Sequence, residues 1–195
     1  MIISAKTTNL PQFRRDMNEL QKRMHDTKPL MKSLAITTHG WILKNARSGG
    51  ALLKGKKWAP LAPSTIAGRR RGSSVPLHDS GHMMKQWSYD YSKTQAVIGN
   101  PMDIAVYHQE GTGLYGPKRK RYTIKPRNKK WLRFVVGGFT VGKWGKAAKR
   151  SRLNYAFAKE VQHPGVPQRR MLPTEKEIGP SLLETLDFWM KKALR

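Results

Sequence analysis

The spacing of apolar residues changes twice along this chain, and that change limits the fold more than any other feature. Near the N-terminus, apolar residues recur at spacings of four, three and four, at Phe13, Met17, Leu20 and Met24. This stripe predicts an amphipathic helix, and a second helical run follows Pro29 as far as Ser48-Gly49-Gly50. Helical spacing returns near the C-terminus, where we expect a buried stripe at Ile178, Leu182, Leu186, Trp189 and Met190.

Between the two helical ends the spacing falls to two, as in a β-strand. Trp87, Tyr89 and Tyr91 alternate with polar residues, and an apolar run at 96–99 follows, which predicts a β-hairpin. We also expect a second strand pair, formed by 122–125 and 131–136. A flexible basic excursion should follow at 142–154, and a further strand at 155–162. The sequence therefore predicts an α+β fold, with a small antiparallel or mixed β-sheet packed against N-terminal and C-terminal helices and with long basic loops.

The length of 195 residues suits one domain with its own core. We expect N-terminal helices over 1–48 and an extended loop over 49–80. A β-sheet region should follow over 81–172, with a basic insertion at about 112–152, and a C-terminal helix over 173–195. In the extended loop, Ser64 is the expected N-cap of a short helix. The chain has no cysteine, which excludes disulfides and thiolate zinc sites. Its apolar stretches are too short for a signal peptide or a membrane span, so we expect cytoplasmic synthesis and no membrane contact.

The charge of the chain is strongly positive and unevenly placed. Its 38 Lys and Arg outnumber its 12 Asp and Glu by 26, so we expect an acidic partner. No acidic residue lies between Asp26 and Asp79, or between Glu110 and Glu160. The candidate contacts for DNA or an acidic protein are cations of these two gaps: Arg69, Arg70, Arg71, Lys118, Arg119, Lys120, Arg121, Lys129, Lys130, Lys143, Lys146, Lys149 and Arg150. Aromatic residues such as Trp131 stand among them, which suits phosphate binding with stacking, while docking on an acidic protein is the alternative.

Residues that could carry catalysis are few. His78, Asp79 and His82 are close in sequence, but Gly81 interrupts a helix there and no HExxH pattern accompanies them. The glycine-rich stretches match neither the P-loop nor the dinucleotide-binding pattern. We therefore predict no catalytic residue, no metal site and no cofactor. A hydrolase that uses His78, Asp79 and His82 is the alternative.

Five short motifs follow one another along the chain, at 58–66, 77–83, 107–111, 124–134 and 161–170. In this order they resemble the phage virion morphogenesis family, the tail-completion proteins typified by protein G of phage Mu. The matching residues are Trp58, Leu61, Thr65, Asp79, Gly81, Tyr107, Gly111, His163, Pro164, Gly165 and Arg169. Arg170 departs from the pattern, since proline is common at its position.

The resemblance implies a bacteriophage virion structural protein of the neck or tail end, which completes the tail or joins it to the head. Such a subunit is expected to form a homo-oligomeric ring, with six-fold symmetry favoured, around the path of the DNA. Its expected partners are neck or connector proteins, tail tube proteins and, without sequence specificity, phage DNA. Its expected location is the virion, and the host cytoplasm during assembly. A free basic nucleic-acid-binding protein is the alternative function.

The first motif residues are expected to be parts of the scaffold. Trp58 and Leu61 should anchor the extended loop, either on this chain's own sheet or on a neighbouring subunit. Asp79 should cap the turn into Gly81, with Ser80 as the alternative cap.

The later motif residues have expected roles of the same kind. Tyr107 should pack beneath the sheet, and Gly111 should permit a chain reversal that a side chain would obstruct. His163-Pro164-Gly165 should form a turn. Arg169 and Arg170 should either form salt bridges across subunits or be simply exposed.

Overall fold

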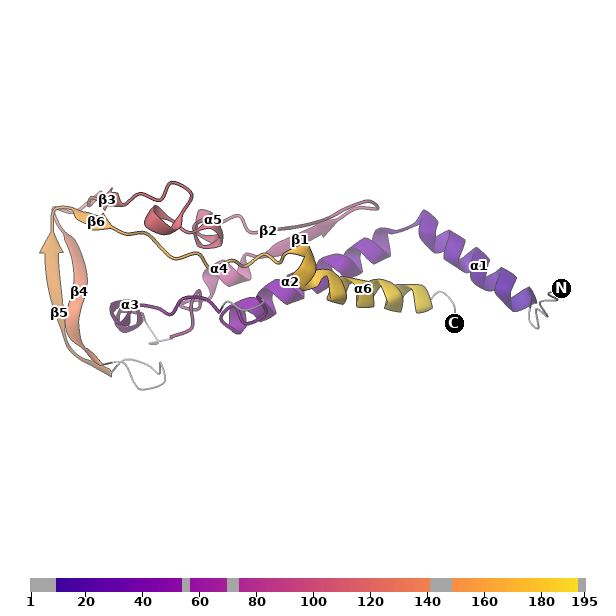
Figure 1. Cartoon of the computed structure of the whole chain (residues 1–195), viewed down its shortest axis with the longest axis horizontal. Coiled ribbons are helices and arrows are strands. Elements are labelled where there is room, and N and C mark those ends of the chain that lie inside the picture. The colour runs from indigo at the N-terminus through magenta and orange to yellow at the C-terminus, as the bar shows by residue number, and fades with distance from the viewer. Residues whose placement is uncertain (1–9, 54–56, 70–73, 141–148, 193–195) are drawn as a thin grey trace, which may run out of the picture. The chain divides into compact units, whose positions relative to one another are not determined.

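A computed structural model of the protein describes residues 10–53, 57–69, 74–140 and 149–192 (Figure 1). The helices of this part are α1 (Leu10–His25), α2 (Lys28–Arg47), α3 (Pro63–Gly68), α4 (His82–Lys85), α5 (Asp103–Glu110), the 3-10 helix η1 (Gly113–Tyr115) and α6 (Glu175–Lys191). Its strands are β1 (Ser88–Tyr91), β2 (Ala96–Gly99), β3 (Tyr122–Ile124), β4 (Leu132–Thr140), β5 (Lys149–Ala158) and β6 (Val161–His163). The predicted α+β class is confirmed, although the described strands form two-stranded ladders rather than one sheet.

The described chain divides into two compact units. The terminal-helix unit comprises α1, the first part of α2, most of the β1–β2 hairpin and most of α6, at residues 10–40, 88–98 and 178–192. The loop-and-ribbon unit comprises the other described residues, from 41 to 87 and from 99 to 177. Both α2 and α6 pass from one unit into the other, so each of these helices contributes residues to both units.

The terminal-helix unit is held by contacts between elements from the two ends of the chain. Thr37 on α2 and Thr185 on α6 join their hydroxyl oxygens at 2.9 Å. The Arg23 guanidinium on α1 donates to the carbonyl oxygens of Trp189 at 3.3 Å and Lys192 at 3.1 Å. Because these carbonyls belong to the last turn of α6, Arg23 provides the cation that a helix C-terminus favours. The two predicted N-terminal helices and the predicted C-terminal helix are thus confirmed as elements.

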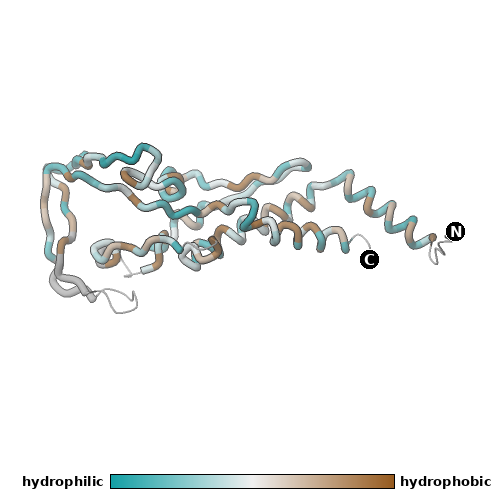
Figure 2. The backbone as a smooth tube through the Cα atoms, viewed as in Figure 1, coloured by the Kyte–Doolittle hydropathy of each residue, from teal (hydrophilic) through white to brown (hydrophobic). Residues whose placement is uncertain are grey.

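The apolar stripes of the terminal helices are largely exposed within the chain. Hydrophobic residues recur along α1 between hydrophilic ones (Figure 2), but none of its side chains, all of them described, is buried. Phe13 is 61% and Met24 66% exposed. On α6, Ile178 is buried while Leu186 and Met190 are exposed, so the prediction of a fully buried C-terminal stripe is wrong. Helical spacing predicts which residues share a face, and it does not say what covers that face.

At the end of α2 the chain enters a turn that contacts the first motif. Gly49 and Gly50 have φ angles of 69° and 85°, which confirms the predicted helix stop, since glycine adopts this left-handed region freely. The Gly50 backbone N–H donates to the Asn45 carbonyl oxygen at 2.9 Å. A Cβ on Gly50 would lie 2.6 Å from Cδ1 of the Trp58 ring. Trp58 is buried, and its indole N–H donates to the Arg170 carbonyl oxygen at 3.0 Å.

Two chain reversals interlock at the centre of the loop-and-ribbon unit. The Leu114 N–H donates to the Pro164 carbonyl oxygen at 2.7 Å. The Thr112 N–H donates to the Val166 carbonyl oxygen at 3.0 Å, and the Val166 N–H donates to the Thr112 hydroxyl at 2.9 Å. Between them Gly165 has a φ of 104°, and a Cβ there would collide with the Thr112 carbonyl oxygen. We call this loop-built region, residues 49–53, 57–62, 108–116 and 163–172, the loop hub.

The β3–β6 and β4–β5 ladders follow one another as a long antiparallel ribbon. Ile124 pairs with Val161 at the end of the first ladder, and Leu132 pairs with Ala158 at the start of the second. The predicted pairing of 122–125 with 131–136 is therefore wrong, because each strand pairs with a segment beyond residue 148. The predicted basic excursion at 142–154 is also wrong from Lys149 onward, where β5 begins; its residues 142–148 lie outside the described part.

The described part of the extended loop contains the predicted short helix. Its short helix is confirmed, but α3 begins at Pro63 with Ala62 at the N-cap and without a side-chain cap. The predicted Ser64 cap is therefore wrong, since Ser64 lies inside the helix. Proline at the first helical position fixes the φ angle needed there and has no N–H to satisfy. This helix lies beside β4, with Ile66 buried.

Candidate functional site

The two strands of the ribbon are unequal in length between the ladders. Seven residues, 125–131, separate Ile124 from Leu132, whereas two residues, Lys159 and Glu160, separate Ala158 from Val161. The excess chain forms a bulge, residues 125–131, on one strand of the ribbon. Residues 126–131 of the bulge line a hollow of about 720 Å³ together with Leu132, Arg133 and Phe157.

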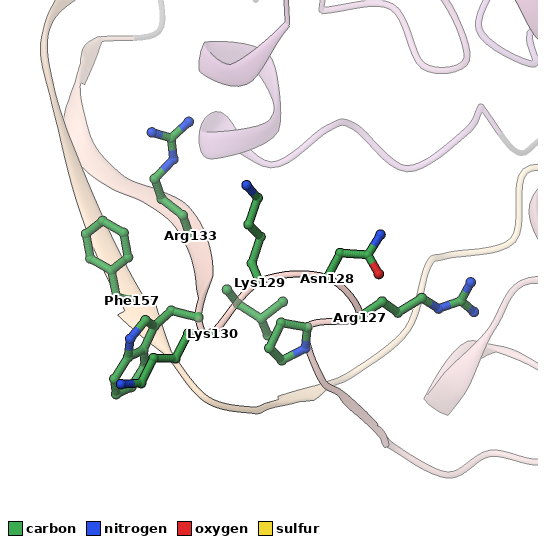
Figure 3. Close-up of a pocket in the computed structure, with 9 residues that line it drawn as sticks. Arg127, Asn128, Lys129, Lys130, Arg133 and Phe157 are labelled. Atoms are coloured by element: carbon green, nitrogen blue, oxygen red, sulfur yellow. The ribbon is translucent and has the colours of Figure 1, made fainter.

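Four cations line this hollow, and Figure 3 shows their arrangement. They are Arg127, Lys129, Lys130 and Arg133, and all four side chains are exposed. Lys129 and Arg133 extend to the same side of the bulge (Figure 3). The Glu160 carboxylate is next to the bulge and pairs with Lys125 at 3.4 Å. Because both members of that pair are exposed, it adds little stability, and it includes none of the four cations that line the hollow.

Aromatic rings stand among these cations on the ribbon. The Arg133 guanidinium carbon lies 4.8 Å from the centre of the Tyr155 ring, and the Lys159 ammonium lies 5.6 Å from the centre of the Trp131 ring. Both are cation–π distances. Arg133 pairs across the strands with Phe157, so the two rings at 155 and 157 lie on the same face as that cation.

Both faces of the ribbon near the bulge expose apolar groups. Phe157 is 61% exposed on the face of Arg133, and Phe134 is exposed on the opposite face. A lone two-stranded hairpin is marginally stable in water. The helix α3 lies beside β4, yet both rings stay exposed. Exposed rings between exposed cations are suited to contact with a molecule that has both negative charge and flat or apolar groups.

The structure brings together some of the predicted cations and not others. Lys129 and Lys130 lie in the bulge, whereas Lys118, Arg119, Lys120 and Arg121 form an exposed run before β3. Arg69 has a structural role instead, because it donates to the carbonyl oxygens of Val75 at 2.6 Å and His78 at 3.1 Å. Arg70, Arg71, Lys143 and Lys146 lie outside the described residues. Lys149 and Arg150 belong to β5, and their side chains are not described.

Several motif residues belong to the loop hub rather than to a reactive site. Trp58 packs within its own chain, on the Gly50 turn and not on a sheet. Leu61 is half-buried and Thr65 is exposed on α3. The predicted reversal at Gly111 is confirmed, since its φ is 78° and a Cβ would lie 2.7 Å from the Tyr115 carbonyl oxygen. The predicted turn at His163-Pro164-Gly165 is confirmed by a 2.9 Å hydrogen bond from the Gly165 N–H to His163 Nδ1.

Two predicted roles need correction. Ser80, not Asp79, accepts from the first N–H of α4, with its hydroxyl 3.2 Å from the His82 nitrogen. Gly81 precedes that helix with a φ of 75°. Tyr107 does not pack beneath a sheet, because it lies on α5 and is 54% exposed.

The two arginines of the last motif are neither simply exposed nor equivalent. Arg169 is 5% exposed and donates to the Ala59 carbonyl oxygen at 3.2 Å. Arg170 makes a two-pronged ion pair with Glu177, at 2.9 and 2.6 Å. That pair is local, between the hub and the start of α6. Hydrogen bonds from Arg170 first, and then from Thr174, lower the pKa of Glu177 to about 2 against the opposing effect of burial.

A second hollow, of about 310 Å³, contains part of the hydrolase alternative. Asp79 and His82 line it with His108 and Arg69, while His78 does not. Burial, and then the charges of Arg169 and Arg69, lower the pKa of His108 to about 4, so its imidazole is neutral near pH 7. Although Asp79, His82 and His108 line one hollow, no three or more His, Asp or Glu side chains within the described ranges are arranged so that they could hold a metal ion.

Sequence reasoning placed Trp131 among the cations of the bulge site but missed the rings of Phe157 and Tyr155. Phe157 and Tyr155 reach Arg133 only because β5 pairs with β4. Their alternation with Ala156 and Ala158 was a usable signal, since it places both rings on one strand face. It also missed Glu177, although Thr174-Glu175-Lys176-Glu177 has the spacing of a capping box. Glu177 accepts from the Thr174 backbone N–H at 2.8 Å, as that motif requires.

Comparisons with known proteins identify one family. A family model described as the phage virion morphogenesis family matches residues 8–191. No curated protein and no solved structure matches the chain. Among the helices that the structure describes, none combines the length and apolar character needed to cross a membrane.

Proposed function

Because the chain belongs to the phage virion morphogenesis family, we propose that it is a structural subunit of the neck or tail end. In this proposal it completes the tail or joins it to the head, and it does so as a six-fold ring around the path of the DNA. The match over residues 8–191 carries the proposal. A virion morphogenesis role follows from the family; the position and the ring are the proposed part.

The surface of the subunit supports an assembled role. The terminal helices and the ribbon expose apolar side chains such as Phe13, Met24 and Phe157. A protein that functions alone usually covers such groups, whereas a subunit of an assembly covers them with its neighbours. A ring also needs a heterologous contact, in which one patch of a subunit binds a different patch of the next. Connector, neck and tail tube proteins are the proposed neighbours.

The proposal is tested by interrupting the gene in its phage and supplying it again from a plasmid. The lysate is examined by electron microscopy, with separate counts of filled heads, free tails and joined particles. We expect filled heads beside unjoined tails, or tails of abnormal length, without the gene, and joined particles with the plasmid. Normal infectious particles without the gene would overturn the proposal.

A second candidate function is favoured by the bulge, whose cations and rings suit a single strand of nucleic acid. In this alternative the chain is a free nucleic-acid-binding protein. It predicts tight binding of an oligonucleotide by the purified protein, with an affinity that falls steeply as salt rises. The variant Lys129→Gln/Lys130→Gln should then reduce the slope of log affinity against log salt by about 1.4, which is about 0.7 for each lost contact with a single strand. Lys22→Gln/Lys85→Gln removes the same charge elsewhere and should leave that slope nearly unchanged.

A further inference from the structure

The terminal helices contain most of the acidic residues of a basic chain. Residues 10–26 hold three of the twelve acids, Asp16, Glu19 and Asp26, and residues 175–192 hold four more, Glu175, Glu177, Glu184 and Asp187. The same two segments hold seven cations: Arg14, Arg15, Lys22, Arg23, Lys176, Lys191 and Lys192. Together they are neutral, although the whole chain has a net charge of +26.

Charge neutrality matters because copies of a strongly basic protein repel one another. Two copies can make close contact most easily where the local charges balance. Contact is least favourable at the four cations that line the hollow of the bulge. Residues 10–26 have a net charge of +1 and residues 175–192 a net charge of −1. The α1 segment of one copy therefore complements the α6 segment of another in sign as well as in magnitude.

Each of these helices also has an exposed apolar seam. On α1 the seam is Leu10, Phe13, Met17, Leu20 and Met24, at alternating spacings of three and four. This is the spacing of coiled-coil core positions. Four of its five residues are exposed and Leu20 is half-buried.

The matching seam on α6 is Leu183, Leu186 and Met190, all exposed and also spaced by three and four. It is distinct from the face that includes Thr185, which bonds to Thr37 within the chain. Asp187 borders this seam, because it lies four residues after Leu183 and three before Met190. Arg14 borders the seam on α1 in the same way, four residues after Leu10 and three before Met17. The bordering charges are opposite in sign.

We infer that the α1 seam of one copy packs on the α6 seam of a second copy. The inference rests on the proposed ring, and it names the surfaces that close it. In the proposed ring, the α1 seam of each subunit packs on the α6 seam of the next, which is a heterologous contact, whereas a contact between two α1 seams would pair subunits about a two-fold axis. The bulge is left free for the acidic partner.

The absence of cysteine from the sequence makes the contact directly testable by cross-linking. One protein has Met17→Cys and another has Leu183→Cys, and the two are mixed and treated with a short bis-maleimide. Only a contact between α1 and α6 of different copies joins the two kinds of chain. The matched control replaces Met17→Cys with Asn18→Cys, which places the thiol one residue away, off the seam.

The reaction is run on the purified proteins at rising concentration and on particles from phage that carry both alleles. We expect a cross-linked dimer from the mixture, and loss of that product with each protein alone and with the Asn18→Cys control. Equal product from Met17→Cys alone would overturn the inference in favour of a two-fold α1 pair. No product from the purified proteins or from particles, with thiols shown to be reactive, would also overturn it.

If either variant prevents particle formation, Leu20→Cys and Leu186→Cys give a second pair on the same seams. The outcome is separable from that of the proposed function. A phage that lacks the gene but makes normal particles overturns the neck or tail role and leaves a cross-linked contact valid. Unjoined tails without the gene, together with no cross-link in restored particles, leave the role standing and overturn this interface.

Discussion

The loop hub and the ribbon differ in how far their large side chains are exposed. In the hub, Trp58 and Met171 are buried, and the Trp58 N–H has a backbone partner. On the ribbon, Trp131 and Phe157 are exposed beside cations. The hub thus buries its large rings within one chain, while the ribbon leaves its large rings exposed. Trp58, Gly111 and Arg169, which helped to mark the family resemblance, belong to the hub. The resemblance therefore reports how the subunit folds more than what it touches.

The largest effect should come from removing the central ring of the hub. Trp58→Ala deletes a buried aromatic side chain that covers Gly50 and donates to the Arg170 carbonyl oxygen. We expect the free energy of unfolding to fall by about 3–5 kcal/mol. Urea unfolding followed by circular dichroism measures it. A loss below about 1 kcal/mol would contradict the view that the hub is a closed core.

A glycine substitution in the hub should be nearly as severe. Gly165→Ala combines a φ of 104° with a collision between the new Cβ and the Thr112 carbonyl oxygen. Gly81→Ala is the matched control, because its φ is 75° and nothing lies within 4 Å of the new Cβ. The control should cost about 1–2 kcal/mol from backbone strain alone. Gly165→Ala should cost clearly more, and equal losses in urea unfolding would show that the collision is relieved at no cost.

The ion pair at the edge of the hub should have a smaller, pH-dependent effect. Glu177→Gln removes the carboxylate that Arg170 and Thr174 contact, and should cost about 1–3 kcal/mol near pH 7. The pKa of Glu177 is lowered from 4.5 to about 2 in the folded protein, so its stabilising effect is complete above the unfolded pKa. That effect should be lost as pH falls from about 4.5 to about 2. Unfolding of both proteins across this range should show their difference shrinking, and a constant difference would contradict it.

The smallest effect on stability should come from the ribbon. Phe157→Ser removes a ring that is 61% exposed, so the free energy of unfolding should change by no more than about 0.5 kcal/mol. Its effect should instead appear in function, as fewer joined particles in the complementation assay. A large loss of stability would show that the ring packs within the chain. A stable variant with normal particle numbers would show that this ring makes no essential contact.

How far the sequence predicts this molecule depends on whether a feature is local. The helices at both ends and the β1–β2 hairpin follow from apolar spacing, and the stops at Gly49 and Gly50 follow from glycine geometry. The partners of the strands do not follow from the sequence, because β3 pairs with β6 across a long stretch of chain. Apolar spacing predicts which residues share a face of a strand, but not which strand lies beside it. Exposure of the α1 and α6 stripes could not be predicted for a related reason. An amphipathic pattern is the same whether its own chain or another chain covers it.

The unequal strands of the ribbon bear on how such proteins can diverge. In a continuous ladder, one inserted residue turns every later side chain to the opposite face. Here the β3–β6 and β4–β5 ladders each have their own register, and the bulge between them absorbs a difference in length. Residues can be gained or lost around Asn128 without altering either ladder. The length of this loop can therefore change during evolution while the registers of both ladders are kept.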